Sequence, residues 1–357
     1  MVINFPKVEN FREVILTNAT KNDYYQLIIF TYSMTLPSFK DYLQLHFIVF
    51  IWGFTAILGR IVTIPYMELV FYRTLFAVIG LWAIFYFQKK SFKVDKKDLW
   101  KFLATGAIIA LHWIFFFGAA QLSNVSICLI GMATSSFWTS LLDPIISRRR
   151  ISWLEITLGV VIVAGLYFVS ATEISYTKGL LLAIIATIFG TIFSIINSKL
   201  IKKHNHYTIT FYEMLGALLA VIVFLPIYQY FFAPNQTLNF ALRGFDWLYI
   251  AILAFVCTVY AYAMSVKLMK KFSVFAINLT VNLEPVYGFG LAYFILNERE
   301  KLPVYLAGAT ILLAVFAYTI LDWYFKLKTQ KNRLEILEEL REEEKKVQQP
   351  VLTTSKS

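Results

Sequence analysis

Charged residues are scarce in this chain of 357 residues. Asp, Glu, Lys and Arg together make up 15% of it, whereas 59% of the residues are hydrophobic and 17% are aromatic. A soluble domain of this length does not need so much apolar surface, so the composition argues against a soluble enzyme or binding module. Cysteine is rarer still: Cys128 and Cys257 both lie inside apolar runs, without the spacing of metal ligands. We expect both to be core residues, and they indicate nothing about the redox compartment.

Several motifs with short, fixed spacings are missing. The sequence has no Walker loop, no G-x-G-x-x-G after a strand, no metal-spaced set of His, Cys and Asp, and no nucleophile elbow. ATP-driven pumping is therefore not expected unless a partner supplies it, and neither a cofactor nor a metal is predicted. The net charge of +11 would suit a nucleic-acid partner, but the basic residues lie in short loops between apolar runs. That distribution is typical of membrane topology, so no nucleic-acid partner is predicted.

Ten apolar segments predict an all-α integral membrane protein with ten transmembrane helices. They lie at residues 43–62, 66–87, 99–121, 124–146, 152–171, 177–198, 208–232, 246–266, 273–296 and 303–325. Lysines and arginines concentrate in the loops after the second, fourth, sixth and eighth segments, and the alternate loops hold few. The positive-inside rule then places the basic loops and both termini in the cytoplasm. We expect a multi-pass protein of the cytoplasmic (inner) membrane, surrounded by lipid.

The ends of the chain differ from its apolar middle. Residues 1–41 form an N-terminal extension in which the apolar stretch at 25–32 is too short to span a bilayer, and no cleavable signal peptide is predicted. Met34 precedes the first span, so the first 33 residues are open to being a start-site artefact. Residues 327–357 form a charged cytoplasmic tail, for which we expect a short surface helix rather than a partner-binding one, followed by disorder from residue 347.

The apolar middle repeats itself. Residues 136–159 and 285–308 match at a constant offset of 149, which pairs FWTSLLDPIISRRR with VYGFGLAYFILNER. Near the start of each half, Trp52-Gly53 matches Phe189-Gly190. Each half holds five segments, an odd number, so the second half enters the membrane upside down relative to the first. Inverted repeats of this kind enclose a site near the membrane midplane and alternate its access between the two sides.

These residues carry a family resemblance. Two five-helix units at 42–172 and 173–326, the WGF start at 52–54, the FYR of the second segment and the NERE…G ending resemble the drug/metabolite transporter (DMT) superfamily, EamA type. The resemblance covers residues 42–325 and implies secondary transport of amino acids, other metabolites or drugs, and in relatives of nucleotide sugars or lipid-linked sugars. The chain departs from the pattern at Ser136, where a proline is expected, so a symmetrical role of the fourth helix does not follow.

The ninth segment, SVFAINLTVNLEPVYGFGLAYFIL, holds the most unusual residues for a membrane helix. Glu284 lies near its middle and is followed by Pro285, which is expected to break or kink the helix. A carboxylate at the centre of a span costs at least ~2.5 kcal/mol, so it is read as functional by default. Counting residues from the segment ends places Arg73 and His112 at a similar depth. An Arg73–Glu284 pair is the economical hypothesis, and it leaves two roles open: a fixed buried pair, or a group that binds charged substrate or takes up a proton.

Aromatic rings at mid-depth extend the candidate site, because such rings can line a cavity that contacts substrate. The residues predicted to bind substrate are Trp52, Arg73, His112, Trp113, Trp138, Tyr260, Asn282, Glu284 and Tyr287, and those predicted to act in gating or proton coupling are Glu284, His112 and Glu213. For each ring, ordinary packing is the alternative. For Glu213, an interfacial acid is the alternative. Asp143 is expected to pair with the arginines at 148–150.

The sequence therefore predicts a secondary transporter of small organic metabolites, an amino acid or related solute, which it exports by alternating access. Proton coupling is an open element of this prediction. A carrier of nucleotide sugars or lipid-linked sugars is the alternative within transport, and it would need a basic pocket for phosphate. A membrane-embedded enzyme or an assembly protein acting through the charged tail is the alternative from another class.

Overall fold

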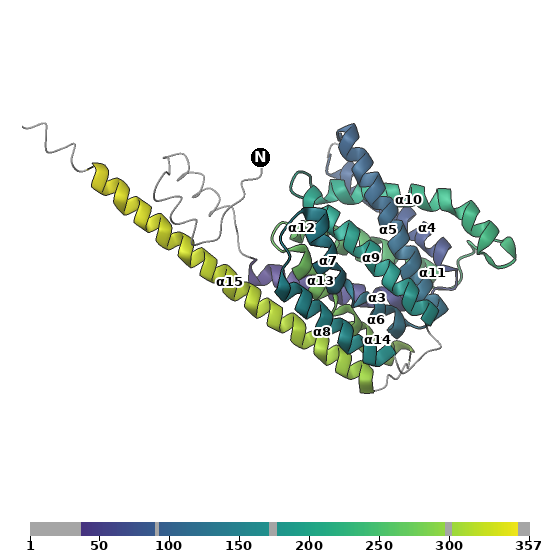
Figure 1. Cartoon of the computed structure of the whole chain (residues 1–357). Coiled ribbons are helices and arrows are strands. Elements are labelled where there is room, and N and C mark those ends of the chain that lie inside the picture. The colour runs from purple at the N-terminus through teal and green to yellow at the C-terminus, as the bar shows by residue number, and fades with distance from the viewer. Residues whose placement is uncertain (1–36, 90–92, 171–176, 297–301, 349–357) are drawn as a thin grey trace, which may run out of the picture. The chain divides into compact units, whose positions relative to one another are not determined.

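The computed structural model describes residues 37–89, 93–170, 177–296 and 302–348, and every regular element within these ranges is a helix. Residues Pro37–Tyr318 form one compact unit, drawn as a bundle of helices in Figure 1. The second unit comprises residues 1–36 and 319–357, of which the structure describes residues 319–348. The expectations for residues 1–36, including the apolar stretch at 25–32 and Met34, lie outside the described residues, as does the disorder expected for residues 349–357.

The helices lie where the apolar segments predict them. In chain order they are α3 (Phe39–Ile61), α4 (Tyr66–Phe87), α5 (Lys96–Leu122), α6 (Val125–Met132), α7 (Ser135–Ser147), α8 (Trp153–Ser170), α9 (Thr177–Leu200), α10 (His206–Phe231), the 3₁₀ turn η2 (Pro234–Gln236), α11 (Asp246–Ala251), the π-helix η3 (Ile252–Tyr260), α12 (Ala261–Leu268), α13 (Val274–Val281), α14 (Glu284–Leu296) and α15 (Leu302–Gln348). Each predicted segment coincides with one of these helices or with a consecutive run of them.

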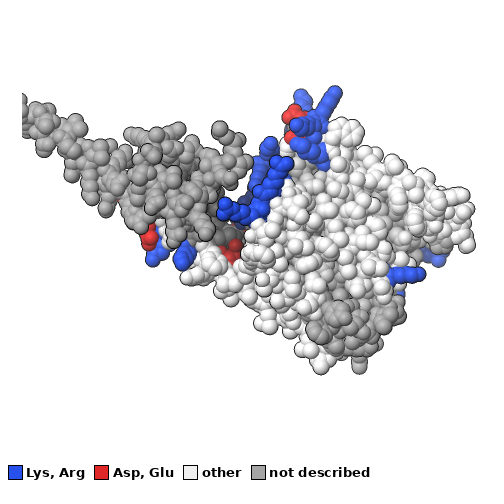
Figure 2. All heavy atoms as spheres, in the orientation of Figure 1, with Lys and Arg blue, Asp and Glu red and all other residues white. Residues whose placement is uncertain are grey.

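Seven helices in the described part of the chain are long and apolar enough to cross a membrane. They are Phe39–Ile61, Tyr66–Phe87, Lys96–Leu122, Val125–Ser147, Thr177–Leu200, His206–Phe231 and Asp246–Leu268, and Trp153–Ala164 and Ala309–Phe325 are shorter apolar helices. The face drawn in Figure 2 carries a broad surface without charged side chains, and lysines and arginines gather at its edges. An uncharged band between charged margins is what a lipid bilayer requires of a protein surface.

Helix ends follow the local sequence. Ser38 caps α3 with a capping box, in which its side chain accepts from the backbone N–H of Asp41 and the Asp41 carboxylate accepts from the backbone N–H of Ser38. Ser273 caps α13 in the simpler way, by accepting from the N–H of Ala276. The first helix therefore begins at Phe39, four residues before the predicted segment, because the cap lies ahead of the apolar run.

Glycines bring α5 and α10 into backbone contact. A Cβ atom added to Gly106 would lie 2.1 Å from the carbonyl oxygen of Glu213, and one added to Gly216 would lie 2.4 Å from the carbonyl oxygen of Leu103. No larger side chain fits at either position, so the crossing depends on both glycines. This close crossing fixes α10, and with it Glu213, against the centre of the bundle.

Two of the predicted segments are broken helices. The fourth is interrupted at Ala133–Thr134, between α6 and α7, and the ninth at Asn282–Leu283, between α13 and α14. These breaks occupy the same two positions of the repeat, at the offset of 149. Pro285 does not itself form the break: it lies in the first turn of α14, where its missing N–H costs no helical hydrogen bond. The first repeat breaks at the same place without a proline.

The eighth segment contains a π-helix. Within Ile252–Tyr260 the backbone adopts the wider i→i+5 pattern, and the Thr258 hydroxyl donates to the carbonyl of Leu253 at 2.9 Å, five residues back. Such segments leave carbonyl groups without their usual helical partners and often occur at functional sites. Here the Cys257 carbonyl accepts a hydrogen bond from the Trp52 indole at 3.1 Å.

The last helix differs from the prediction. The sequence predicts a span over 303–325 and a separate short surface helix in the tail, whereas α15 is one helix of 47 residues that runs from Leu302 to Gln348. The change from apolar to charged composition does not end it, because no glycine or proline lies between Gly308 and Pro350.

Candidate functional site

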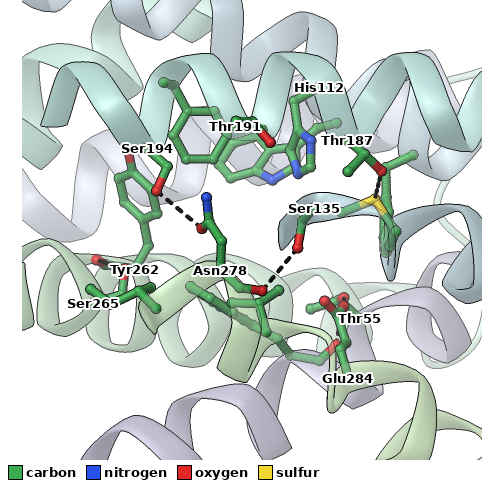
Figure 3. A pocket seen from close by; sticks show the side chains of 18 of the residues that line it. Thr55, His112, Ser135, Thr187, Thr191, Ser194, Tyr262, Ser265, Asn278 and Glu284 are labelled. Carbon is green, nitrogen blue, oxygen red and sulfur yellow. Dashed lines mark hydrogen bonds between the residues drawn. The ribbon is translucent and has the colours of Figure 1, made fainter. Parts of the chain in front are cut away.

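A cavity of about 100 Å³ lies inside the 37–318 unit and is lined by side chains from both repeats. Figure 3 shows it between α9 above and the broken helix α13–α14 below. Five of the residues predicted to bind substrate line it: Trp52, Arg73, His112, Trp113 and Glu284. These residues come from α3, α4, α5 and α14, so the cavity collects ionisable groups that lie far apart in the sequence.

Arg73 and Glu284 both face the cavity, but they do not form the predicted pair. The Arg73 guanidinium, on a side chain that is 2% exposed, donates from Nε to the hydroxyl of Thr258 at 2.9 Å and lies 4.0 Å from the centroid of the Trp113 ring. No carboxylate among the described residues lies within 4.0 Å of it. Thr258, which lies in the π-helix, gives the guanidinium a neutral partner instead.

Glu284 begins α14 and is 4% exposed. Its Oε1 lies 3.4 Å from the hydroxyl of Thr55, which also lies 2.6 Å from the carbonyl of Trp52. The Thr55 hydroxyl has a single proton, and the shorter contact shows that it is donated mainly to the Trp52 carbonyl. Glu284 therefore receives only a weak hydrogen bond from Thr55. Among the described residues no cation lies within 4.0 Å of this carboxyl group; the positive charge of Arg73 acts on it at longer range, and its oxygens can accept hydrogen bonds from a molecule in the cavity.

His112 presents one ring nitrogen to a fixed partner. Its Nδ1 lies 2.7 Å from the carbonyl oxygen of Ala186 on α9, and a carbonyl oxygen can only accept, so Nδ1 carries a proton. Gly190 lies beneath the ring, where a Cβ atom would be 3.1 Å from Nδ1. The ring also packs edge-on against Phe193, with 5.4 Å between the centroids. Nε2 has no protein partner among the described residues, and His112 lines the cavity.

The two broken helices are joined at their breaks by side chains that the sequence analysis did not select, apart from Asn282. Asn282 is fully buried; its amide nitrogen donates to Ser136 Oγ at 2.7 Å, and its amide oxygen lies 2.6 Å from Ser135 Oγ. Asn278 donates to Thr139 Oγ1 at 2.7 Å. It also accepts from Ser194 on α9 at 3.2 Å (Figure 3). Asn282 is thus held as a connector behind the cavity wall, and Asn278 takes the place expected for it in the wall.

A polar stripe on α9 forms the opposite wall. Thr187, Thr191 and Ser194 follow one another at helical spacing and line the cavity (Figure 3), and Asn197 continues the stripe one turn further. The hydroxyl of Thr191 is buried without a hydrogen-bond partner. The sequence analysis missed this stripe, although hydroxyl and amide side chains at every third or fourth position of an apolar helix are a readable pattern.

Four of the residues predicted to bind substrate, and one predicted to act in gating, lie outside the cavity. Trp138, Tyr260, Asn282 and Tyr287 do not line it. Tyr260 is 39% exposed at the end of the π-helix, and Tyr287 packs edge-on against Phe50, with 5.6 Å between the ring centroids. Glu213 also lies outside, but it is fully buried and contacts Tyr262, which does line the cavity.

Polar contacts tie both ends of α3 to the segment that carries the π-helix. At one end Lys271 Nζ lies 2.8 Å from each carboxylate oxygen of Asp41. At the other end the backbone N–H and the hydroxyl of Thr63 donate to the carboxylate of Asp246 at 3.0 and 2.6 Å. These two contacts clamp α3 against residues 246–271 at both of its ends.

The predicted pairing of Asp143 with the arginine run is confirmed. Arg149 donates from Nε to Asp143 and from Nη2 to Glu155, in the connection between α7 and α8. Partial burial lowers the pKa of the Arg149 guanidinium, but its hydrogen bonds to Glu155 and Asp143 outweigh that effect, and the net pKa is raised. This cluster braces a helix connection away from the cavity.

Comparison with known proteins agrees with this architecture. A model of the EamA-like transporter family matches residues 42–171 and matches again at residues 177–320. No curated protein sequence matches the chain. One solved structure, described only as "Crystal structure of protein", superposes with a TM-score of 0.60 at 15% sequence identity, over 79% of this chain and 97% of the other. At that identity the likeness shows the fold alone. The two family matches cover most of the sequence, and the chain therefore belongs to the EamA-like transporter family of the DMT superfamily, whose members are multi-pass membrane proteins.

Proposed function

We propose that this chain is a secondary transporter that exports a small organic metabolite, an amino acid or a related zwitterion, across the cytoplasmic membrane. Its ten segments would form two inverted five-helix repeats, with both termini in the cytoplasm. The single observation that carries the proposal is that Arg73 and Glu284 face one buried cavity without pairing with each other.

The two ionisable groups suit the two ends of an amino acid. A guanidinium whose Nε is already anchored on Thr258 keeps its terminal nitrogens for a carboxylate, which it can bind in a bidentate manner. Glu284, with only a weak donor from Thr55, can accept hydrogen bonds from an ammonium group. Trp52, Trp113 and His112 supply apolar faces for the rest of the molecule.

Alternating access has a natural mechanical basis in this arrangement. The breaks in α6–α7 and α13–α14 occupy equivalent repeat positions and are joined through Asn282, so the two broken helices would move together. The contacts at Asp41–Lys271 and Thr63–Asp246 lie at opposite ends of α3, and opening one end at a time would expose the cavity to one side of the membrane.

The experiment is a binding and transport panel on the full-length protein reconstituted in liposomes. Binding is followed by the fluorescence of the cavity tryptophans, and flux by radiolabelled solute, for amino acids, amines without the carboxylate, acids without the amine, and nucleotide sugars. L-Phenylalanine should bind and exchange across the membrane, and 2-phenylethylamine and 3-phenylpropionate should each bind at least tenfold more weakly. Transport of nucleotide sugars with no amino acid binding would overturn the proposal, and so would equal binding of all three phenyl compounds.

A further inference from the structure

A second polar cluster lies behind the cavity wall, around Glu213 on α10. The Glu213 side chain is fully buried, and its Oε2 accepts a hydrogen bond from the hydroxyl of Tyr262 at 2.8 Å. Asn197 donates from Nδ2 to the same Tyr262 hydroxyl at 2.6 Å, and that nitrogen lies 3.5 Å from Glu213 Oε2. All donors therefore converge on one side of the carboxyl group.

The remaining oxygen atoms of this cluster have no hydrogen-bond donor. Glu213 Oε1 and Asn197 Oδ1 are both buried acceptors without a hydrogen-bond partner. Buried polar atoms without partners are rare, and each calls for something that the protein itself does not supply. Two orphan acceptor oxygens in one hydrogen-bonded cluster call for a donor, and a proton on the carboxyl group is the smallest one.

Among the residues that the structure describes, no charged side chain of the surrounding helices compensates Glu213. Tyr262, from α12, is its one titratable contact within the described residues. On α4, Arg73 is turned to Thr258 and Trp113; on α5, His112 is turned to Ala186, and Gly106 contributes only its backbone. An ionised carboxylate here would be a buried charge without a cation, a state that proteins avoid by neutralising the group.

Tyr262 connects this cluster to the cavity. It lines the cavity beside Ser194 and Asn278 (Figure 3), while its hydroxyl group holds Glu213. A hydrogen bond to an ionised carboxylate is about twice as strong as one to a neutral carboxyl group. Gain or loss of a proton at Glu213 would therefore loosen or tighten the side chain that forms part of the cavity wall.

We propose that Glu213 is the proton-binding carboxyl group of this transporter, and that Tyr262 transmits its protonation state to the substrate cavity. The proposal rests on the transport function proposed above. It assigns the coupling role to a residue outside the cavity and leaves Glu284, inside it, for the substrate. In this scheme one proton binds to Glu213 Oε1 and leaves from the same atom, and Tyr262 acts as a positioning residue.

The first test does not need a substrate. Infrared spectra of the full-length protein in lipid, recorded between acidic and alkaline pH, report protonated carboxyl groups by their C=O stretch. Glu213→Gln should remove one component that is present at neutral pH, and Tyr262→Phe should shift the frequency of that component. Asp246→Asn is the matched control and should leave this component in place, because Asp246 is also buried but both of its carboxylate oxygens accept hydrogen bonds, from Thr63 and from the backbone N–H of Arg243. A spectrum unchanged by Glu213→Gln would overturn the proposal. Loss of the protonated component when sodium is added at constant pH would also overturn it, because the carboxyl group would then bind sodium.

The second test separates coupling from transport. In liposomes, exchange of radiolabelled L-phenylalanine at equal pH is compared with uptake driven by a pH gradient. Glu213→Gln should lower the gradient-driven uptake at least tenfold and change exchange by less than twofold, whereas an equal loss of both would make Glu213 a structural residue and overturn the coupling role. If the unmodified protein exchanges no amino acid, the proposed function fails, and the infrared result alone decides whether Glu213 binds a proton.

Discussion

Replacement of Arg73 by lysine separates the geometry of the guanidinium from its charge. Arg73→Lys keeps a positive charge in the cavity but loses the planar fork, the Nε bond to Thr258 and the stacking on Trp113. A hydrogen bond to a charged group contributes about 1.5–3 kcal/mol, so loss of one bond of a bidentate pair should weaken the binding of a carboxylate about 10-fold to 150-fold.

The assay is a titration of tryptophan fluorescence with matched ligands. Trp52 and Trp113 line the cavity, and L-phenylalanine does not absorb where tryptophan is excited. The unmodified protein and Arg73→Lys are each titrated with L-phenylalanine and with 2-phenylethylamine, which lacks the carboxylate. Because any change in fold acts on both ligands, the difference between the two losses isolates the interaction of Arg73 with the carboxylate.

The expected result is a large loss for the amino acid and a loss of less than about threefold for the amine, which corresponds to under about 0.7 kcal/mol. If both ligands lose the same factor, Arg73 holds the cavity wall together and does not bind the carboxylate. A gain in affinity for the amino acid would refute the reasoning altogether.

Three further predictions concern the scaffold. Gly106→Ala should lower the free energy of unfolding by about 1–3 kcal/mol or more, because the added methyl group would meet the backbone of Glu213. Thermal unfolding in detergent measures this change. Gly290→Ala is the control and should change little, because a methyl group at Gly290 would enter open space. Asn282→Leu should cost about 1–3 kcal/mol, because it leaves the Ser136 hydroxyl without its partner, whereas Ser135 keeps its hydrogen bond to the carbonyl of Asn278; a midpoint equal to that of the unmodified protein would contradict the bridge between the broken helices. Lys271→Met should change stability by less than about 1 kcal/mol because the pair with Asp41 is partly exposed; the same scan in high salt should show no difference, and a larger, salt-independent loss would count against this reading.

The positions of the helices along the chain were predictable because the length and hydrophobicity of each segment identify it in the sequence. The ionisable members of the site were predictable for a related reason, since Arg73, His112 and Glu284 are costly in a membrane and must face something polar. Their partners were not predictable. The distance between Arg73 and Glu284 depends on the rotation of α4 and α14 about their own axes, and residue depth alone does not give that rotation.

Tyr260 and Tyr262 illustrate the limit. Both lie within the eighth segment, two residues apart, which places their side chains about 200° apart around a helix. Tyr260 is partly exposed and Tyr262 faces the cavity, and residue depth alone does not show which of the two rings points inward. By contrast, the stripe of Thr187, Thr191 and Ser194 needed no structural information, only attention to hydroxyl groups at helical spacing.

The nine residues of η3 form a π-helix, in which each hydrogen-bonded turn holds one residue more than in an α-helix. Returning them to ordinary α-helical bonding would shift the hydrogen-bond register by one residue, and each residue of an α-helix corresponds to a rotation of about 100°. The helix on one side of η3, α12, would then rotate relative to α11 on the other side. This rotation would move the Cys257 carbonyl away from Trp52 and the Thr258 hydroxyl away from Arg73 at the same time. Because Trp52 and Arg73 both line the cavity, such a change of helix type would alter the two sides of the cavity together.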